Sequence, residues 1–428
     1  MRYILIISII LFVLLGGVIH LGSQSQPSNV VVITIESTRA DHLGPCYGYT
    51  RRTSPNICDL ASDGVLFKNA YSQGSSTDRS VPPMLTGMTP SRVSYKNFNQ
   101  TLPSSLPTIH GVLAKRGFRS FKSPHLSFDV NNESFISNRR IRDIDFNDEP
   151  IYAWKFFRSP SPHRPYSPRK KYQRWNDPIP PPLLKNLTSP HVQLPVESNL
   201  SKSTIIALYD GSIRSVDSRI GDIISHLKEE SVYQESMIIV TSDHGEKFGE
   251  HGRFGRHGGL PYNNVIHVPL VIKYPGNTYA GTVINGPVAI SSIPSTVYDT
   301  LNLSDAPDTF FDSLNKVIIN DSNYSSPVVS VGRPLQSWSY QEDKFKYLLK
   351  NAQAVCTSSK YTPSQELYRL SNNREELIDV SGQYPRKVEE MQNETCEVFL
   401  HGLASREIRR KNLSVRQKQN LRDLGYLQ

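Results

Sequence analysis

The sequence contains little cysteine, little tryptophan and only one long apolar run. Its 428 residues include four cysteines and three tryptophans, and residues 3–21 are the one stretch that is almost wholly apolar. The cysteines lack the spacing of a zinc knuckle, and no internal repeat is visible. No basic motif interleaved with aromatic residues is present, so we expect no nucleic-acid partner. The formal net charge of +9 instead favours anionic partners, such as membrane surfaces or charged substrates.

The N-terminal apolar run predicts a membrane anchor. At about 1.5 Å per residue, residues 3–21 are just long enough to span a bilayer. Arg2 precedes them and places the N-terminus in the cytoplasm by the positive-inside rule. We therefore expect a single-pass transmembrane anchor in the cell membrane at residues 1–22, a polar tether at 23–29 and an extracytoplasmic body. A signal peptide cleaved near Leu21-Gly22-Ser23 is the alternative, and it leads to the same compartment.

The cysteines and the sequons agree with an extracytoplasmic body. Cys46 lies close to Cys58 in the sequence, and Cys356 shares the C-terminal region with Cys396. An oxidising compartment predicts two disulfide bonds in these pairs, with four free thiols as the alternative. Nine Asn-x-Ser/Thr sequons are also present, as in a glycoprotein.

Strand-like and helix-like patterns alternate along the chain. We expect strands at residues 30–35, 64–69, 118–121, 237–241 and 267–273, a helix at 105–116 and a long amphipathic helix at 203–228. This alternation predicts an α/β fold over residues 30–326, with a doubly wound, mostly parallel sheet flanked by helices. Beyond residue 327, strands near 332–350 and a helix near 384–403 predict a smaller α+β C-terminal subdomain over 327–428. The Pro-rich basic segment 159–195 predicts a long surface loop.

Two expected strands end in side chains that suit a metal ion. Glu36 directly follows residues 30–35, and the pair Asp243-His244 follows residues 237–241. In an open α/β sheet, ligands bind at the carboxyl ends of the strands. A carboxylate beside an imidazole is half of a divalent-metal site. The alternatives are a helix-capping or surface acid at Glu36 and a solvated loop at Asp243.

The segment from Gly74 to Gly87 places hydroxyl side chains before paired prolines. Because proline is tolerated in a first helical turn, we expect a helix that starts near Val81. Its N-terminal dipole would point at an anionic group beside Thr77. A Ser/Thr-rich turn with an ordinary N-cap is the alternative.

Several ordered motifs together resemble one known family. They are Ile35-Glu36-Ser37-Thr38-Arg39-Ala40-Asp41-His42-Leu43-Gly44, Leu85-Thr86-Gly87, Pro162-His163-Arg164-Pro165-Tyr166, Thr241-Ser242-Asp243-His244-Gly245-Glu246, Gly249-Glu250-His251-Gly252 and His257. This set resembles the sulfatase family of the alkaline-phosphatase superfamily, and it covers essentially everything after the anchor. The resemblance implies an alkaline-phosphatase-like fold and a metal-dependent hydrolase of sulfate or phosphate esters.

The nucleophile region departs from that family. Sulfatases convert a Cys or Ser in a Cys/Ser-x-Pro-x-Arg setting to formylglycine. The family spacing, counted back from Gly87, reaches Thr77, and a threonine cannot form the aldehyde because its β-carbon carries a methyl group. Ser75 stands four residues before Arg79 and is the alternative, although its spacing is too long and the Pro is missing. The first metal ligand is Glu36, where most sulfatases have Asp.

A second resemblance fits these departures. Phosphoethanolamine transferases and lipoteichoic-acid-type synthases have a Glu on the first strand, a Thr nucleophile and an Asp-His pair, similar to Glu36, Thr77 and Asp243-His244 here. Ser80-Val81-Pro82-Pro83-Met84 resembles the segment after the transferase nucleophile. Those transferases usually carry several membrane helices, whereas this chain has one apolar run.

The two resemblances together imply a mechanism. One divalent metal ion, Ca²⁺ or Mn²⁺ with Zn²⁺ left open, would be held by four residues: Glu36, Thr77, Asp243 and His244. Thr77 would attack the ester, Arg79 would offset charge on its oxygens, and His163 or His257 would protonate the leaving oxygen.

Three functions follow from that mechanism. The first is a sulfatase-like hydrolase that acts on an anionic ester of a glycan or lipid. The alternatives are a head-group transferase that acts on envelope lipids or glycans and a catalytically inactive binding protein. The sequence leaves the oligomeric state open.

Overall fold

The computed structural model describes residues 29–93, 102, 105–122, 135–137, 141–146, 149–157, 166, 168–173, 175, 199–252, 257–320, 327–333, 336–358, 360–371 and 373–410. The predicted anchor, nearly all of the tether and most of the predicted loop 159–195 lie outside these residues. None of the helices in the described part combines the length and apolar character that a membrane crossing requires.

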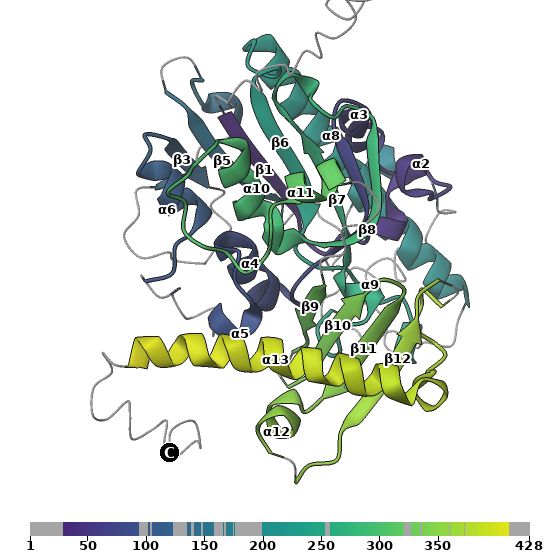
Figure 1. The fold of residues 1–428 in the computed structure, drawn as a ribbon. Coiled ribbons are helices and arrows are strands. Elements are labelled where there is room, and N and C mark those ends of the chain that lie inside the picture. The colour runs from purple at the N-terminus through teal and green to yellow at the C-terminus, as the bar shows by residue number, and fades with distance from the viewer. Residues whose placement is uncertain are drawn as a thin grey trace, which may run out of the picture.

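An eight-stranded sheet forms the centre of the larger part of the molecule (Figure 1). Its strand order is β4-β3-β5-β1-β6-β7-β2-β8. The strands are β1 (Asn29–Ile35), β2 (Val65–Tyr71), β3 (Arg119–Lys122), β4 (Phe135–Ser137), β5 (Ile151–Phe157), β6 (Ser236–Ser242), β7 (His267–Lys273) and β8 (Thr282–Ala289). Only β7 is antiparallel to its neighbours, so the predicted mostly parallel sheet is confirmed.

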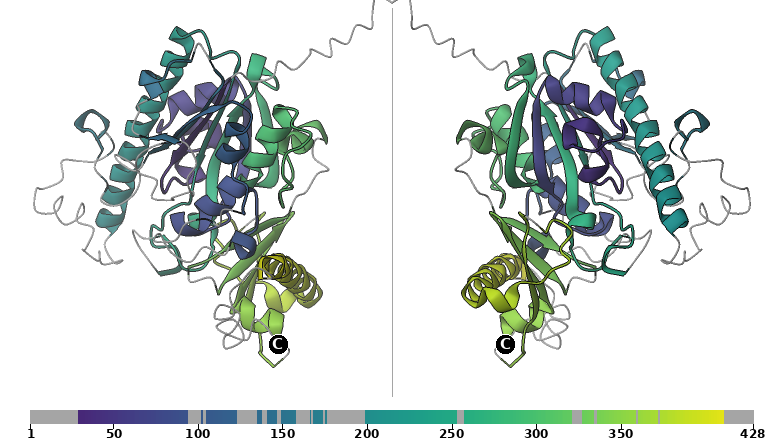
Figure 2. Two further views of the ribbon diagram at one scale, coloured as in Figure 1. Left: turned by 90° about the vertical axis from the view of Figure 1, so that its left-hand side faces the viewer. Right: turned by 90° about the vertical axis from the view of Figure 1, so that its right-hand side faces the viewer.

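Helices cover both faces of this sheet, as Figure 2 shows. The helices that precede the C-terminal part are α2 (Gly44–Tyr47), α3 (Pro55–Ser62), α4 (Thr77–Thr86), α5 (Pro90–Val93), α6 (Ile109–Ala114), α8 (Asn199–Glu229), α9 (Asn263–Ile266), α10 (Ile293–Thr300) and α11 (Leu314–Asn320). On β1, Val30 and Val32 pack in the core with α4, α6 and α10, whereas Val31 and Ile33 pack in the core with α3 and α8. Successive strand side chains point to opposite faces, so β1, which is buried along its whole length, is the centre of a doubly wound fold.

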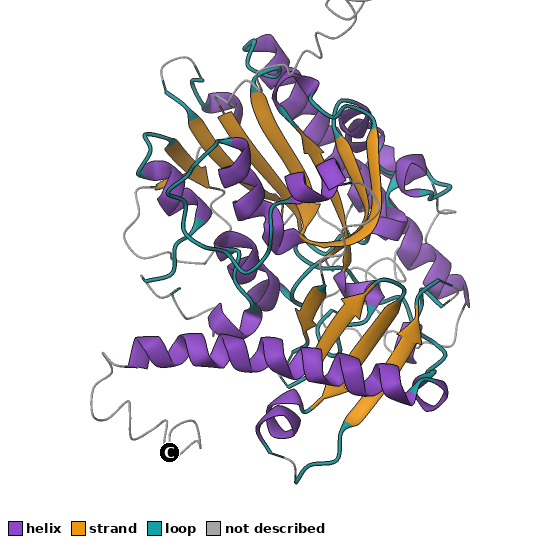
Figure 3. Cartoon of the chain, viewed as in Figure 1, coloured by secondary structure: helices purple, strands orange, loops and turns teal. Residues whose placement is uncertain are grey.

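A small antiparallel sheet follows, in the order β12-β11-β10-β9. Its strands are β9 (Val328–Val331), β10 (Trp338–Glu342), β11 (Phe345–Lys350) and β12 (Ser364–Arg369), and its helices are α12 (Ala352–Thr357) and α13 (Pro385–Arg410). Figure 3 shows α13 crossing this sheet and continuing below α5. The α+β character of the C-terminal part is therefore as predicted, and we propose residue 327 as its boundary.

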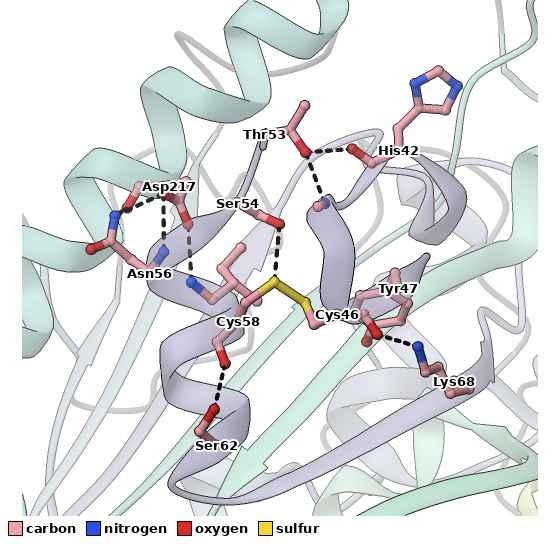
Figure 4. Close-up of a disulfide and its surroundings, with 12 residues drawn as sticks. His42, Cys46, Tyr47, Thr53, Ser54, Asn56, Cys58, Ser62, Lys68 and Asp217 are labelled. Atoms are coloured by element: carbon pink, nitrogen blue, oxygen red, sulfur yellow. Dashed lines mark hydrogen bonds between the residues drawn. A yellow bond between two sulfur atoms is a disulfide. The ribbon is translucent and has the colours of Figure 1, made fainter. Parts of the chain in front are cut away.

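Both predicted disulfide bonds are present. Cys46 bonds to Cys58, which joins α2 to α3 beside the first strand–helix connection (Figure 4). Cys356 bonds to Cys396, which joins α12 to α13. No free cysteine remains among the described residues.

One helix prediction was too long. Helix α6 covers Ile109–Ala114 rather than 105–116, and the Thr108 side chain accepts a hydrogen bond from the Gly111 amide at its start. Pro107 biases Leu106, the residue before it, away from the helical conformation, so the helix begins only after this proline.

Candidate active site

The ends of β1 and β6 bring the two predicted carboxylates to one edge of the sheet. Ile35 pairs with Ser242 of β6, so Glu36 and Asp243 are the next residues of adjacent parallel strands. Glu36 is 4% exposed and its amide donates to Phe157 O at the end of β5. Asp243 is fully buried. The sheet register therefore places both side chains where open α/β folds bind ligands.

Asp243 is held by hydrogen bonds from three segments. Its Oδ1 accepts from the amides of Ser37 (3.0 Å) and His244 (2.9 Å), and its Oδ2 accepts from Thr77 Oγ1 (2.7 Å). Ser72 Oγ donates to its carbonyl oxygen. Ser37 has a left-handed φ of 59°, an uncommon conformation for a non-glycine residue, and this turn aims its amide at Asp243.

The backbone fixes the tautomer of His244. Its Nδ1 lies 2.8 Å from Gly245 O, so Nδ1 carries the hydrogen and donates it. Nε2 then presents its lone pair, 3.1 Å from Thr77 Oγ1. His257 lies beside this imidazole, with ring centroids 4.3 Å apart. The structure thus brings Thr77, Asp243, His244 and His257 together.

Thr77 is the first residue of α4. The prediction that this helix starts near Val81 was wrong, because the Ser80 amide already donates to Ser76 O and closes the first turn. Pro82 and Pro83 consequently lie inside the helix, where each omits one backbone hydrogen bond. The earlier start puts Thr77 itself at the positive end of the helix dipole.

The C-terminal sheet positions the segment that leads to Thr77. Val331 of β9 forms a parallel bridge with Gly74: its amide donates to Gln73 O, and its carbonyl accepts from the Ser75 amide. Ser75 Oγ donates to Gly259 O at 3.1 Å. Ser75 is thus engaged with the loop after His257, whereas Thr77 contacts Asp243 and His244.

Two further predicted residues are less closely tied to this centre. Arg79 is 8% exposed, and its Nε lies 3.8 Å from Asp78 Oδ2. Arg79 lies two positions after Thr77, which is a rotation of about 200° around the helix axis. Its side chain therefore leaves α4 on the side opposite to that of Thr77. His163 lies outside the described residues.

The donor chemistry suits a divalent cation, although the cluster is not closed. Two carboxylates, one imidazole nitrogen and one hydroxyl are the ligand types of Ca²⁺, Mn²⁺ and Zn²⁺ sites. Within the described ranges, no three His, Cys, Asp or Glu side chains lie close enough to form a complete metal site. Thr77 contacts both Asp243 and His244, so Glu36 is the proposed ligand whose part in the site a variant must test.

Arg39 forms a network of hydrogen bonds behind the site. Its Nε and Nη2 donate to both carboxylate oxygens of Asp41, and its Nη1 donates to Glu250 Oε1 and to Glu246 O. Although half of the Asp41 side chain is exposed, the charge and hydrogen bonds of Arg39 lower the pKa of Asp41 below its usual range. Asp41 therefore orients Arg39.

Tyr209, which the sequence did not single out, ties this network to the first turn. Its hydroxyl accepts from the Arg39 amide and donates to Ser37 O. In the sequence, Tyr209 looks like an ordinary core residue of α8, so no signal in the sequence could identify its role.

A basic cavity of about 600 Å³ adjoins the nucleophile segment. Lys247, Arg333 and Lys350 line it, and so does Gly259, whose carbonyl accepts from Ser75. Arg333 is half exposed, and its Nε lies 3.7 Å from Oδ2 of Asp78, the residue that follows Thr77. Arg333 could not be identified from the sequence, because only its backbone pairing with Gly259 places it at this cavity. The cavity suits an anionic ligand.

Comparisons with known proteins agree with the motifs. The sulfatase family model matches residues 28–156 and 144–303. Human iduronate 2-sulfatase is 23% identical over 353 residues, 62% of this chain and 63% of that protein. An arylsulfatase of Clostridium perfringens is 24% identical over 364 residues, 64% of this chain and 75% of that protein. The chain thus spans slightly less than two thirds of the human relative.

Solved structures share the fold. The phosphonate monoester hydrolase of Agrobacterium radiobacter superposes with a TM-score of 0.71 at 18% identity, over 88% of this chain and 96% of that one. A protein solved in complex with its substrate D-glucosamine-2-N,6-O-disulfate gives a TM-score of 0.69 at 16% identity, over 88% and 98%. With the family model covering more than half of its residues, the chain belongs to the sulfatase family, within the alkaline-phosphatase superfamily.

Proposed function

We propose that the protein is a metal-dependent hydrolase of sulfate or phosphate esters that uses Thr77 as its nucleophile. The observation that carries the proposal is the position of Thr77 Oγ1, which lies 2.7 Å from Asp243 Oδ2 and 3.1 Å from His244 Nε2. A hydroxyl that donates its proton to a carboxylate, beside an imidazole nitrogen, is the arrangement of an activated nucleophile.

In the first half-reaction, Thr77 Oγ1 bonds to the sulfur or phosphorus atom and its proton passes to Asp243. The bond from that atom to the leaving oxygen breaks, and His257 donates a proton to this oxygen. Arg79 and His163 are the residues proposed to offset charge on the other ester oxygens. A divalent metal ion held by Glu36, Asp243, His244 and Thr77 would lower the pKa of the threonine hydroxyl.

In the second half-reaction, water attacks the threonine ester. His257 takes a proton from that water, the bond to Oγ1 breaks, and Asp243 returns the proton to Thr77. A threonine ester has no second hydroxyl on its β-carbon, so it cannot release the acid by collapsing to a carbonyl group. An external oxygen must therefore release it, either from water or from an acceptor alcohol.

The proposed substrate is an anionic ester on a glycan. Lys247 and Arg333, which line the adjoining cavity, support additional negative charge on that substrate, whereas Lys350 is paired with Glu366. Relatives and structural neighbours named for sulfated sugars point the same way. A lipid ester is the alternative substrate. We also propose that the body lies outside the cytoplasm and is held at the membrane by a single N-terminal anchor.

The second candidate function is transfer of a head group to an acceptor. The observation that favours it is the threonine itself, which replaces the residue that other sulfatases oxidise. A product that forms only with an acceptor alcohol would identify a transferase, and free acid would identify a hydrolase. Turnover of either kind would exclude the inactive binding protein.

The test is turnover of an aryl sulfate and the matching aryl phosphate by the purified protein with Ca²⁺, Mn²⁺ or Zn²⁺. We expect Thr77→Ala to lower kcat by at least about 1,000-fold, as loss of a nucleophile does. Ser75→Ala is the matched control, because Ser75 Oγ contacts Gly259 O instead of Asp243. Activity that survives Thr77→Ala and is lost with Ser75→Ala would reject the proposal.

A further inference from the structure

The short helix α9 lies where the two sheets meet (Figure 1). It runs from Asn263 to Ile266, directly before β7 of the large sheet, and all of its residues are buried. Its first residue contacts the C-terminal part, and its last two carbonyl groups accept hydrogen bonds from two segments of the candidate active site. The contacts of α9 therefore join the C-terminal part to the centre.

A buried ion pair of the C-terminal part holds the start of α9. Lys346 Nζ, from β11, lies 2.6 Å from Glu376 Oε1, and both side chains are fully buried. Glu376 Oε2 accepts the Asn263 amide hydrogen at 2.5 Å, and Lys346 Nζ donates to Asn263 Oδ1 at 2.9 Å. Asn263 Nδ2 donates to Arg374 O. Both polar atoms of the Asn263 side chain and its backbone amide are thus bound by the C-terminal part.

The end of α9 holds the backbone that orients His244. Val265 O accepts the Gly245 amide hydrogen at 2.9 Å, and Gly245 O accepts from His244 Nδ1 at 2.8 Å. The two segments are in close contact, because a Cβ on Gly245 would lie 2.3 Å from Asn264 O. A shift of α9 would therefore move the carbonyl group that fixes the tautomer and the orientation of His244.

The same end of α9 holds the segment that leads to Thr77. Ile266 O accepts the Ser72 amide hydrogen at 2.8 Å. Ser72 Oγ donates to Asp243 O, and Asp243 Oδ2 accepts from Thr77 Oγ1. Two neighbouring carbonyl groups of one short helix thus support both of the segments that meet at Thr77 and Asp243.

We propose that Glu376 is a positioning residue for the reaction: it holds α9 in place, and α9 aligns His244 and Asp243 with Thr77. Lys346 offsets the charge of the buried carboxylate, which would otherwise be costly to bury. The effect on turnover rests on the proposed function, whereas the effect on the backbone hydrogen bonds of α9 is independent of the reaction.

Two double variants separate the hydrogen bond from the buried charges. Lys346→Met/Glu376→Gln and Lys346→Met/Glu376→Met both remove the ion pair without leaving an unpaired buried charge. Their side chains are similar in size, and only glutamine keeps an oxygen that accepts the Asn263 amide hydrogen. We expect the variant with methionine at both positions to lose kcat about 10- to 100-fold with little change in KM, as when an outer partner of a catalytic group is lost. The glutamine variant should recover most of that loss.

Hydrogen exchange followed by mass spectrometry measures the positioning without turnover. The Ser72 and Gly245 amides, which donate to α9, should exchange about tenfold faster in the variant with two methionines than in the glutamine variant, because weaker local structure opens more often. Asp379→Asn is the control, since the Asp379 carboxylate accepts from the Leu367 and Ser381 amides rather than from α9. It should leave kcat and both exchange rates unchanged.

The two measurements distinguish this inference from the proposed function. Equal kcat in the two double variants, or equal exchange of the Ser72 and Gly245 amides, would reject the positioning role. Wild-type turnover that survives Thr77→Ala would instead reject the proposed function, and the exchange rates would still test how α9 is held.

Thermal unfolding checks that the double variants fold. If the variant with two methionines does not fold, Asn263→Pro takes its place, because proline is tolerated at a first helical position and lacks the amide hydrogen. This variant keeps the ion pair of Lys346 with Glu376, and the same losses are expected. Wild-type kcat and wild-type exchange in Asn263→Pro would also reject the positioning role.

Discussion

At the scale of single residues, hydrogen bonds distinguish two hydroxyl side chains only two positions apart. Thr77 Oγ1 donates to Asp243, whereas Ser75 Oγ donates to Gly259 O. Neither contact follows from composition, because the partners are 166 and 184 residues distant in the sequence. The resemblance to transferases pointed to Thr77, and the contacts of the folded chain support the same choice.

A Thr77→Ser variant tests whether the hydroxyl alone is sufficient. Serine keeps the oxygen, but it loses the methyl group that restricts the side-chain rotamer. We expect kcat to fall by about 10-fold, far less than for Thr77→Ala. The measurement is kcat for the better of the two aryl esters. Equal losses in the serine and alanine variants would mean that the oxygen of Thr77 is not the reacting atom.

Glu250 gives the fold a stability that depends on pH. Burial raises its pKa, but Arg39 and the Phe248 amide outweigh that effect and lower the pKa below its usual 4.5. A lowered carboxyl pKa adds stability above the unfolded value, and that stability is lost as the pH falls through the folded value. We expect Glu250→Gln to lower stability by about 1–2 kcal/mol at pH 7.

The measurement for Glu250 is the Tm of both proteins from pH 3 to pH 7. The difference should be widest above pH 5 and should narrow as the pH falls below 4.5. A difference that grows towards acid pH would contradict the assigned ion pair. Glu375→Gln, which changes a glutamate at an exposed position, is the control.

At the scale of elements, the start of α4 depends on a glycine. A Cβ on Gly74 would lie 2.4 Å from the backbone of Arg79, so only glycine lets the segment before Thr77 pack against the first turn. We expect Gly74→Ala to shift this turn and lower kcat about 100-fold, because misplacement by 1 Å has effects of that size. Gly382→Ala, where a Cβ meets no atom within 4 Å, is the control. Full activity in Gly74→Ala would show that α4 tolerates the shift.

The sequence predicted elements best where local pattern and packing agree. The β-branched run of β1 predicts a strand that packs on both faces, and it does so between two cores. The apolar periodicity of α8 predicts a helix that packs on one side, and that side lies in one of these cores. Helix α4 was placed wrongly because proline normally marks a first turn, whereas here Ser76 is the N-cap and the helix begins at Thr77, before the prolines. The bridge from Gly74 to Val331 was not predictable, because it depends on how two sheets pack.

At the scale of the whole molecule, two disulfides stabilise separate parts of the fold, one joining α2 to α3 and the other joining α12 to α13. Cys46–Cys58 closes 12 residues and Cys356–Cys396 closes 40. Loop-closure entropy gives stabilisation of about 3 and about 4 kcal/mol. We expect the Cys356→Ser/Cys396→Ser variant to lose more stability than Cys46→Ser/Cys58→Ser, measured by denaturant unfolding. The reverse order would show that strain or residual structure outweighs loop length.

The central claim for the molecule is that Thr77 carries the reacting group between two half-reactions. The most direct measurement quenches the protein in acid during turnover of an aryl ester and analyses the peptide that contains Thr77 by mass spectrometry. We expect a sulfate or phosphate group on Thr77 that accumulates within one turnover and decays when substrate is removed. Turnover without any adduct on Thr77, or with the adduct on Ser75, would contradict the account.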